Sequence, residues 1–199
     1  MRGRRFESSK TGRKTLPKID AEPTKESRYI FQGKVVSLRV DTVQLPNGGL
    51  SAREVVEHSD AVAVVPVDSD GNAILVRQYR KAVDETLLEV PAGGMDVGET
   101  PKAAARRELL EETGFRAKDF EYLGGFYTTP GFCTELMHSF LATGLTSGEA
   151  QPEFDESIEV VSVSLHEIHT MLREGEFQDA KSIASLLLVL DRLGVSTSV

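Results

Sequence analysis

The sequence contains one cysteine, no tryptophan and no long apolar run. Cys133 has no second cysteine to pair with, which excludes an internal disulfide framework and is typical of a protein of the reducing cytoplasm. No segment approaches the ~20 consecutive apolar residues that a membrane-spanning helix needs. The N-terminus also lacks the apolar core of a secretory signal. We therefore expect a cytoplasmic protein with no membrane partner, in which Cys133 is a small buried side chain.

Positive charge is scarce outside the N-terminus. The net charge is −8, yet residues 1–19 hold seven basic side chains and one acidic side chain, so the rest of the chain carries about −14. Nonspecific binding to nucleic acid needs a basic surface, so we expect no nucleic-acid partner. Residues 1–27 are interpreted as a basic, disordered tail, because a short charged segment is typically solvated.

Strand and helix patterns alternate after the tail. Two alternating runs flank Asn47-Gly48, which is a strong hairpin signal. Short apolar or alternating runs predict further strands at 61–67, 73–80, 86–93, 120–129, 135–145 and 158–165, and helical patterns occur at about 166–173 and 178–192. This mixture predicts an α/β or α+β protein with a mixed sheet.

One helix is bounded by clear local signals. Thr100 can cap the first turn, and Pro101 suits the first helical position because its missing N–H would have no partner there. Gly114 is typical of a left-handed stop after the last turn. The sequence therefore predicts a helix over residues 101–113.

Three glutamates of this helix share one face. Glu108, Glu111 and Glu112 stand at the i, i+3 and i+4 positions, and Arg107 lies four residues before Glu111, where it can form an ion pair with that glutamate. One interpretation is an ordinary solvated acidic face. The other is a site for a hard divalent cation such as Mg²⁺, which prefers oxygen ligands and often also takes substrate phosphates.

The stretch from Gly93 to Phe115 resembles the signature of the Nudix hydrolase family. That signature is Gly, five residues, Glu, seven residues, then Arg-Glu-hydrophobic-x-Glu-Glu-x-Gly-hydrophobic. The matching residues here are Gly93, Glu99, Arg107, Glu108, Leu109, Glu111, Glu112, Gly114 and Phe115. The resemblance implies a loop–helix–loop that binds divalent metal and hydrolyses a nucleoside diphosphate linked to another group. It also implies an α/β/α sandwich with a mixed sheet.

The resemblance assigns roles position by position. Glu108 and Glu112 resemble the principal metal ligands, and Glu111 a further ligand or the activator of the attacking water. The backbone carbonyl of Ala92 resembles an additional ligand. Gly93 and Glu99 resemble structural positions, with Arg107 and Glu99 orienting the loop against the helix. The expected cofactor is Mg²⁺, with Mn²⁺ or other divalent cations as alternatives, in two or three ions.

The flanking segments are similar to the ADP-ribose pyrophosphatase branch of this family over residues 29–190. The similarity includes the segments "AREVVEH", "ILVRQYR" and "YTTPGF" and a proline, Pro130, fifteen residues after Phe115. It implies Mg²⁺-dependent hydrolysis of ADP-ribose to AMP and ribose 5-phosphate. The alternatives are a Nudix hydrolase for another nucleotide sugar or a dinucleotide and, more distantly, a ligand-sensing module that does not cleave.

The same branch suggests substrate contacts. Arg80 matches a position that contacts the diphosphate, which suits a guanidinium group, although it could also be a surface arginine at a strand end. Arg53 and Glu54 match contacts to the adenosine end, from the same or a partner subunit, and Tyr29 and Phe31 could stack on adenine. The segment 131–135 is expected to line the terminal ribose. Its candidate contacts are Phe132 and Glu135.

The general base is expected in the acidic loop 147–157. In the family a glutamate from a mobile loop can deprotonate the attacking water, and Glu156 matches best, with Glu153 second; a plain acidic solvent loop is the alternative. The resemblance also implies a small N-terminal antiparallel β domain over 28–58, exchanged across a homodimer, and a Nudix domain over 59–195.

Overall fold

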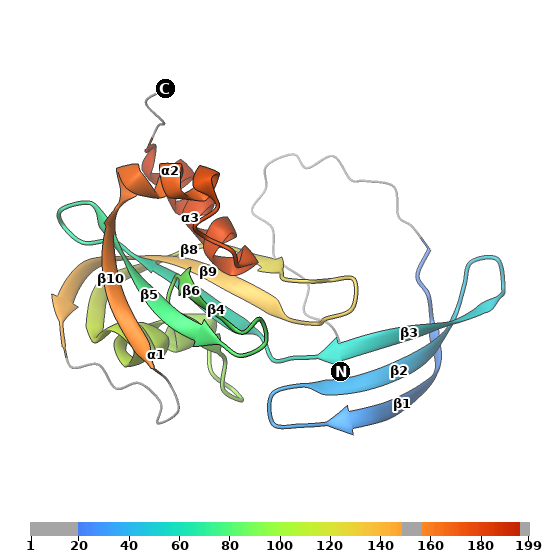
Figure 1. The fold of residues 1–199 in the computed structure, drawn as a ribbon. Coiled ribbons are helices and arrows are strands. Elements are labelled where there is room, and N and C mark those ends of the chain that lie inside the picture. The colour runs from blue at the N-terminus through green and yellow to red at the C-terminus, as the bar shows by residue number, and fades with distance from the viewer. Residues whose placement is uncertain (1–19, 149–156, 196–199) are drawn as a thin grey trace.

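The computed structural model describes residues 20–148 and 157–195. Figure 1 shows a body of mixed strands and helices with a separate small sheet extending to one side. The elements are β1 (Thr24–Gln32), β2 (Ser37–Gln44), β3 (Leu50–Glu57), β4 (Ala61–Pro66), β5 (Asn72–Arg80), β6 (Glu85–Glu89), β7 (Ala92–Gly94), α1 (Pro101–Thr113), β8 (Phe115–Tyr127), β9 (Leu136–Ser147), β10 (Ile158–Ser164), α2 (Leu165–Glu174) and α3 (Ala180–Leu193).

The body is built on two sheets. The first has the strand order β7-β4-β9-β8, in which β4 and β9 are parallel and the other pairs are antiparallel; the second is the antiparallel sheet β10-β5-β6. The predicted mixed α+β class and mixed sheet are therefore confirmed. No helix in the described ranges is long and apolar enough to cross a membrane.

Strand β4 lies at the centre of the core, and every one of its residues is buried. Side chains alternate between the faces of a strand, so β4 contributes to two apolar clusters. Val62 and Val64 pack in the cluster that contains Leu109 of α1. Ala63 and Val65 belong to the cluster that contains residues of α2 and α3. Helix α1 is therefore held on one face of the sheet by apolar contacts, and its polar face is left for the site.

Strands β1, β2 and β3 form a three-stranded antiparallel sheet outside the body. All nine residues of β1 are exposed. The sheet is tied to the body at the end of β3, where the Val56 N–H donates to the Phe132 carbonyl (2.7 Å) and the Thr134 N–H donates to the Val56 carbonyl (3.0 Å). The predicted hairpin at Asn47-Gly48 is the β2–β3 connection. Strand β1 begins at Thr24, so residues 24–27, assigned above to the tail, are part of a strand.

Two strand predictions need correction. The run 86–93 was expected to be one strand, but the chain turns at Pro91 and divides into β6 and β7, which lie in different sheets. The strand expected from residue 120 begins at Phe115, directly after the helix stop at Gly114. The halves of 86–93 pair with different strands, β6 with β5 and β7 with β4, and the start of β8 pairs with the distant end of β9, Phe115 with Ser147.

Candidate active site

Helix α1 spans the predicted residues and uses the predicted caps. The Thr100 side chain accepts a hydrogen bond from the Ala103 N–H, and Pro101 opens the helix. Gly114 has φ +72°, a left-handed conformation that favours glycine, and its N–H donates to the Leu110 carbonyl. Because Ala104, Ala105 and Leu109 are buried against the sheet, the rotation of the helix is fixed, and so is the direction of its glutamates.

Arg107 is the centre of the polar contacts around α1. Its Nη1 lies 2.6 Å from Glu108 Oε1 and 3.0 Å from Glu111 Oε2. Its Nε and Nη2 lie 3.2 and 3.0 Å from the two oxygens of Glu99, and Nη2 also donates to the Gly94 carbonyl at 2.9 Å. The ion pair expected between Arg107 and Glu111 is present. The Arg107 guanidinium thus connects the loop before α1 to two carboxylates of the helix.

These contacts affect the ionisation of the groups involved. Hydrogen bonding to Glu99 raises the pKa of Arg107 above its usual value, with further contributions from Glu108 and Glu111, although burial opposes the shift. The same hydrogen bonds lower the pKa of Glu99 despite its burial. The loop and the helix are therefore joined by groups that remain charged near neutral pH.

The close approach of the Glu108 carboxylate to residue 93 explains why the motif begins with a glycine. A Cβ atom at this position would lie 2.2 Å from the carboxyl carbon of Glu108, which is closer than real Cβ contacts. The backbone of β7 can approach the Glu108 carboxylate only because residue 93 has no side chain. In the preceding residue, the Ala92 N–H donates to Glu112 Oε2 at 3.1 Å. Strand β7 thus lies directly against two buried glutamates of α1.

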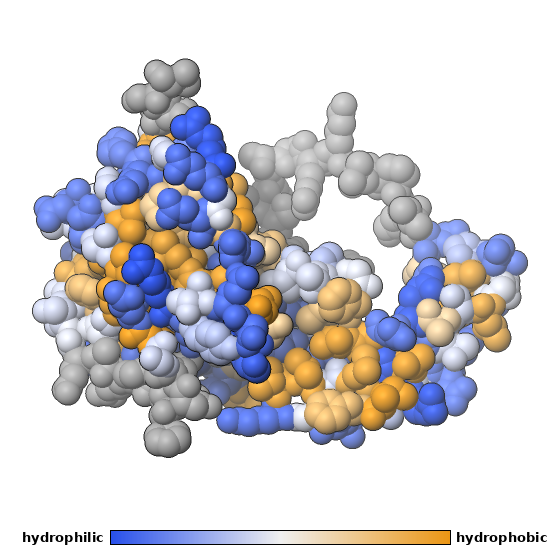
Figure 2. Space-filling view, in the orientation of Figure 1, coloured by the Kyte–Doolittle hydropathy of each residue, from blue (hydrophilic) through white to orange (hydrophobic). Residues whose placement is uncertain are grey.

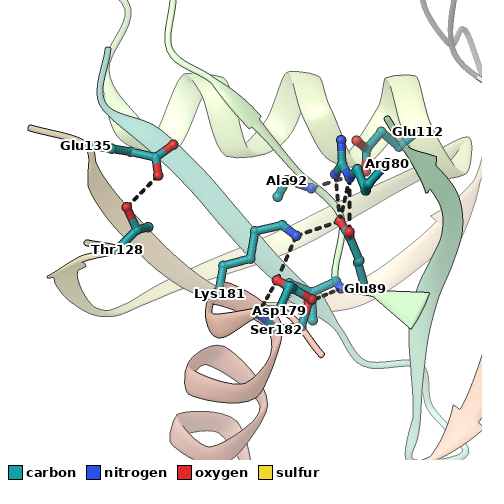
Figure 3. A network of polar contacts seen from close by, with 10 residues as sticks. Arg80, Glu89, Ala92, Glu112, Thr128, Glu135, Asp179, Lys181 and Ser182 are labelled. Carbon is teal, nitrogen blue, oxygen red and sulfur yellow. Dashed lines mark hydrogen bonds and ion pairs between the residues drawn. The ribbon is translucent and has the colours of Figure 1, made fainter. Parts of the chain in front are cut away.

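Arg80 lies at the end of β5 and is paired with a buried carboxylate that the sequence analysis did not identify. Its Nε lies 3.0 Å from Glu89 Oε1, and its Nη2 lies 2.6 Å from Glu89 Oε2. Hydrogen bonding to Glu89 raises the pKa of Arg80, against the effect of burial, and the charges of Glu89, Glu112 and Asp179 add to the rise. Figure 3 shows the Arg80 guanidinium between Glu89 and Glu112.

The other expected substrate contacts lie outside this cluster. Arg53, on β3, pairs with Glu22 through Nη2 and Oε1 at 2.7 Å, and Glu54 is exposed. Because consecutive strand residues point to opposite faces of a sheet, Arg53 and Glu54 of one chain face in different directions. Tyr29 and Phe31 of β1 are about half exposed, and the Tyr29 hydroxyl donates to Glu57.

The segment 128–135 forms a loop at the junction with the small sheet. Thr128 Oγ1 donates to Glu135 Oε2 at 2.7 Å, and His58 Nδ1 lies 3.3 Å from Glu135 Oε1. Glu135 therefore closes the base of the loop, while Phe132 projects with 55% of its surface exposed. Cys133, expected to be buried, is partly exposed. Glu153 and Glu156, the candidates for the general base, lie outside the described residues.

The carboxylates of Glu108, Glu111 and Glu112 are suitable ligands for a divalent cation, although they contact other groups in this structure. Among the described residues, no three His, Cys, Asp or Glu side chains already form a metal site. Instead, Arg107 contacts Glu108 and Glu111, and the Ala92 N–H contacts Glu112. Carboxylate oxygens beside a closely approaching glycine backbone are nevertheless the hard ligands that Mg²⁺ prefers.

A buried network that the sequence analysis missed adjoins the candidate site. It comprises Glu89, Asp179, Lys181 and Ser182, which Figure 3 shows beside Arg80. One signal was available: Glu89 is the only acid in the otherwise apolar run "LLEVPAG". A carboxylate in a buried strand requires a charged or hydrogen-bonding partner. The sequence could not identify Lys181 as that partner, because it lies 92 residues away.

Comparison with known families agrees with this geometry. A model of the NUDIX domain matches residues 57–186, and a model of the nucleoside diphosphate sugar hydrolase N-terminal domain matches residues 22–56. The first match includes β4 to β10 and all of α1, and the second covers the small sheet. The chain belongs to the Nudix hydrolase family, whose members generally use divalent cations.

Individual relatives cover most of the chain. An ADP-ribose pyrophosphatase of Bacillus subtilis (strain 168) is 44% identical over 163 residues, covering 81% of this chain and 88% of the relative. A methanol dehydrogenase activator of Bacillus methanolicus is 39% identical, covering 86% of this chain and 94% of the relative. A crystal structure of an ADP compounds hydrolase superposes with a TM-score of 0.81 at 23% identity, covering 90% of this chain and 98% of that chain, and confirms the fold.

Proposed function

We propose that this Nudix hydrolase cleaves the diphosphate of ADP-ribose, producing AMP and ribose 5-phosphate, with Mg²⁺ as its cofactor. The observation that carries the proposal is the arrangement of α1 against β7, where Glu108 and Glu112 are buried beside the backbone of Ala92 and Gly93. The 44% identity to an ADP-ribose pyrophosphatase supports the choice of substrate.

The glutamates of α1 are the proposed cation ligands. Glu108 and Glu112 are the principal ligands, with Glu111 and the Ala92 carbonyl as additional ones, and two or three ions would be held there. When bound, such ions polarise a phosphoryl group and lower the pKa of water. Glu99 and Arg107 do not bind the ions in this scheme. They fix the loop before α1 against the helix through the bidentate contact at 3.2 and 3.0 Å.

Hydrolysis requires a nucleophile, a base and stabilisation of the developing negative charge. A water oxygen forms a bond to one phosphorus, the bridging P–O bond breaks, and the proton of the water passes to a carboxylate. We assign this proton transfer to Glu156, with Glu153 as the second candidate and Glu111 as an alternative activator of the water, because a carboxylate near the attacking water is a suitable base. The Arg80 guanidinium, close to Glu112 in Figure 3, would neutralise charge on the diphosphate oxygens.

The rest of the substrate would be held by the small sheet and the 128–135 loop. Phe132 and Glu135 are proposed to line the terminal ribose. Arg53 and Glu54 are proposed to contact the adenosine end. Since they point to opposite faces of β3, at least one of them would act in the site of a partner subunit. Cys133, the single cysteine, supports a cytoplasmic location.

A homodimer is part of this proposal, because the small sheet leaves much apolar surface uncovered. Its exposed large apolar side chains are Tyr29, Ile30, Phe31, Val35 and Leu50. Figure 2 shows hydrophobic residues gathered over this sheet. Exposed apolar side chains gathered in this way are typical of an interface. A second copy that covers it would place residues of β3 near the partner's active site.

A panel of diphosphates with Mg²⁺ tests the proposal. ADP-ribose, ADP-glucose, GDP-mannose and NAD⁺ would be assayed separately, with released nucleotide measured by chromatography. We expect the highest kcat/KM for ADP-ribose. In Glu112→Gln we expect a loss of about 10²- to 10³-fold, because charge stabilisation by a bound cation contributes several kcal/mol. The matched control is Glu121→Gln, an exposed glutamate on β8.

Two results would refute different parts of the proposal. If NAD⁺ or GDP-mannose is cleaved rapidly and ADP-ribose is not, the substrate assignment is wrong and the alternative of another nucleotide sugar or dinucleotide is correct. If Glu112→Gln is as active as the wild type on every substrate, Glu112 is not a cation ligand. Absence of cleavage of any diphosphate by the folded wild type would favour a ligand-sensing role.

A further inference from the structure

Glu89 is a fully buried carboxylate shared by two cations. Only 1% of its side chain is exposed, yet it accepts hydrogen bonds from Arg80 and from Lys181, whose Nζ lies 2.5 Å from Oε2. Burial alone would raise the pKa of Glu89, but the hydrogen bonds and charges of the two cations lower it overall. Glu89 is therefore an anion in the core of the protein, held between residues of β5 and α3.

The exposure of the three charged groups differs. The side chains of Glu89 and Lys181 are 1% and 15% exposed, whereas that of Arg80 is 37% exposed. Arg80 uses Nε and Nη2 to bind Glu89, so Nη1 is not engaged by that carboxylate. Glu89 thus fixes one edge of the guanidinium, while the Arg80 side chain as a whole is 37% exposed.

Lys181 changes the charge that an anion near Arg80 would meet. A single arginine paired with a single buried carboxylate is neutral overall and attracts a diphosphate weakly. With Lys181 on the same carboxylate, the three side chains together carry one positive charge. Asp179, the N-cap of α3, accepts from Lys181 at 2.8 Å and from the Ser182 N–H, on the far side of Lys181 from Arg80 (Figure 3). The negative charges of Asp179 and Glu112 also act on Arg80, so without Lys181 the surroundings of Arg80 would be still more negative.

The same network is connected to the glutamates of α1. The Val90 N–H, next to Glu89, donates to the buried Ser182 Oγ at 2.9 Å. Two residues further, the Ala92 N–H donates to Glu112. The first turn of α3 therefore fixes the backbone segment 89–92, and this segment supports Arg80 at one end and Glu112 at the other.

We propose that Glu89 and Lys181 are positioning residues for recognition of the diphosphate and that both act through Arg80. Glu89 orients the guanidinium, which would otherwise lose considerable rotamer entropy on binding a phosphate. Lys181 offsets the charge of Glu89, so that Arg80 still attracts an anion. This inference rests on the proposed function in taking the substrate to be a nucleoside diphosphate and Arg80 to contact its phosphate oxygens.

A double-mutant cycle between Lys181 and Arg80 tests the inference. The variants are Lys181→Met, Arg80→Ala and their combination, assayed for kcat and KM on the diphosphate that the wild type cleaves best. We expect Lys181→Met to raise KM about tenfold with a small change in kcat, because it weakens an interaction made in both the ground state and the transition state. In the Arg80→Ala background, the same change should alter KM less than about twofold.

Further variants separate positioning from folding. Lys181→Arg keeps the charge and should restore most of the affinity, whereas Lys118→Met, an exposed lysine on β8, is the matched control and should match the wild type. Glu89→Gln keeps the side-chain shape and should raise KM, provided that its thermal unfolding shows a folded protein. If this variant does not fold, the Lys181 series alone decides the question.

The inference is overturned if the effects of Lys181→Met and Arg80→Ala on KM are additive. If Lys181→Met raises KM equally in the wild type and in Arg80→Ala, then Lys181 does not act through Arg80 and its role is structural. An Arg80→Ala variant with wild-type KM would also refute the inference. Failure of the wild type to cleave ADP-ribose would contradict the proposed substrate alone, because the cycle is measured on whichever diphosphate is cleaved best.

Discussion

The α1 region and the small sheet β1–β3 differ in how far their side chains are covered and contacted by other residues of the same chain. In the α1 region the glutamates, the Gly93 backbone and Arg107 contact one another directly, and the helix is packed on the core. In the small sheet every residue of β1 is exposed, and large apolar side chains face solvent. The first region is complete within the chain, whereas the second lacks a covering surface.

This difference indicates two kinds of role. A cation site needs ligands that are held rigidly, and the proposed ligands on α1 are held by contacts within one chain. A three-stranded sheet with exposed apolar side chains has little stability of its own, and in the proposed homodimer it would gain stability from the partner. The predictions below test whether the α1 region acts alone and whether the small sheet requires a second copy.

After Glu112→Gln, the largest loss of activity is expected from adding one methyl group to the α1 region. Gly93→Ala would place a Cβ 2.2 Å from the Glu108 carboxyl group. The end of a glutamate can move, so the free energy of unfolding should change by less than about 1 kcal/mol. However, Glu108 would be displaced from its position, and kcat/KM should fall about 10- to 100-fold.

The adjacent glycine provides the matched control. A Cβ at Gly94 would meet only Ser59 Oγ, at an ordinary 3.6 Å. Gly94→Ala should therefore keep kcat/KM within about twofold of the wild type. Equal activity of Gly93→Ala and the wild type in steady-state assays would contradict the close approach of β7 to Glu108.

The next effect, on self-association instead of activity, is expected in the small sheet. Phe31 is 57% exposed on β1, and buried aromatic residues often dominate interfaces. Phe31→Ser should weaken self-association by about 1–3 kcal/mol, as measured by sedimentation equilibrium over a range of concentrations. Lys25→Ser, on the same strand, should leave the dimer unchanged. A wild type that is monomeric at all concentrations, or a Phe31→Ser dimer of unchanged affinity, would contradict the proposed interface.

The smallest effect concerns acid stability, to which both regions contribute. The hydrogen bond from Arg107 lowers the pKa of Glu99, and the hydrogen bond from Ser27 lowers the pKa of Asp41, with burial opposing both shifts. A carboxylate with a lowered folded-state pKa stabilises the fold above its unfolded pKa. This stabilisation is lost as the pH falls through the folded-state value.

Urea unfolding at a series of pH values measures this contribution. The free energy of unfolding should be nearly constant above about pH 5 and should decrease below about pH 4.5. Glu99→Gln and Asp41→Asn should each make the decrease shallower. If both variants keep the wild-type slope, Glu99 and Asp41 do not contribute to the acid sensitivity.

The same contrast explains how much could be predicted from the sequence. Helix α1 was predicted to its ends because Thr100, Pro101 and Gly114 act within one or two turns. The pair Arg107–Glu111 was predictable for the same reason. Glu89 and Lys181 were missed because the fold alone brings them together, across 92 residues. The division of 86–93 at Pro91 depends on which sheet each half joins, and local patterns do not encode that.

The most direct test of the central claim is Mn²⁺ binding, measured by electron paramagnetic resonance without substrate. Mn²⁺ is a spectroscopic substitute for Mg²⁺ at oxygen-ligand sites. The wild type should bind Mn²⁺, Glu121→Gln should bind it equally, and Glu112→Gln should bind it at least about tenfold more weakly while remaining folded by circular dichroism. Equal Mn²⁺ binding by the wild type and folded Glu112→Gln would show that the acidic face of α1 is not the cation site.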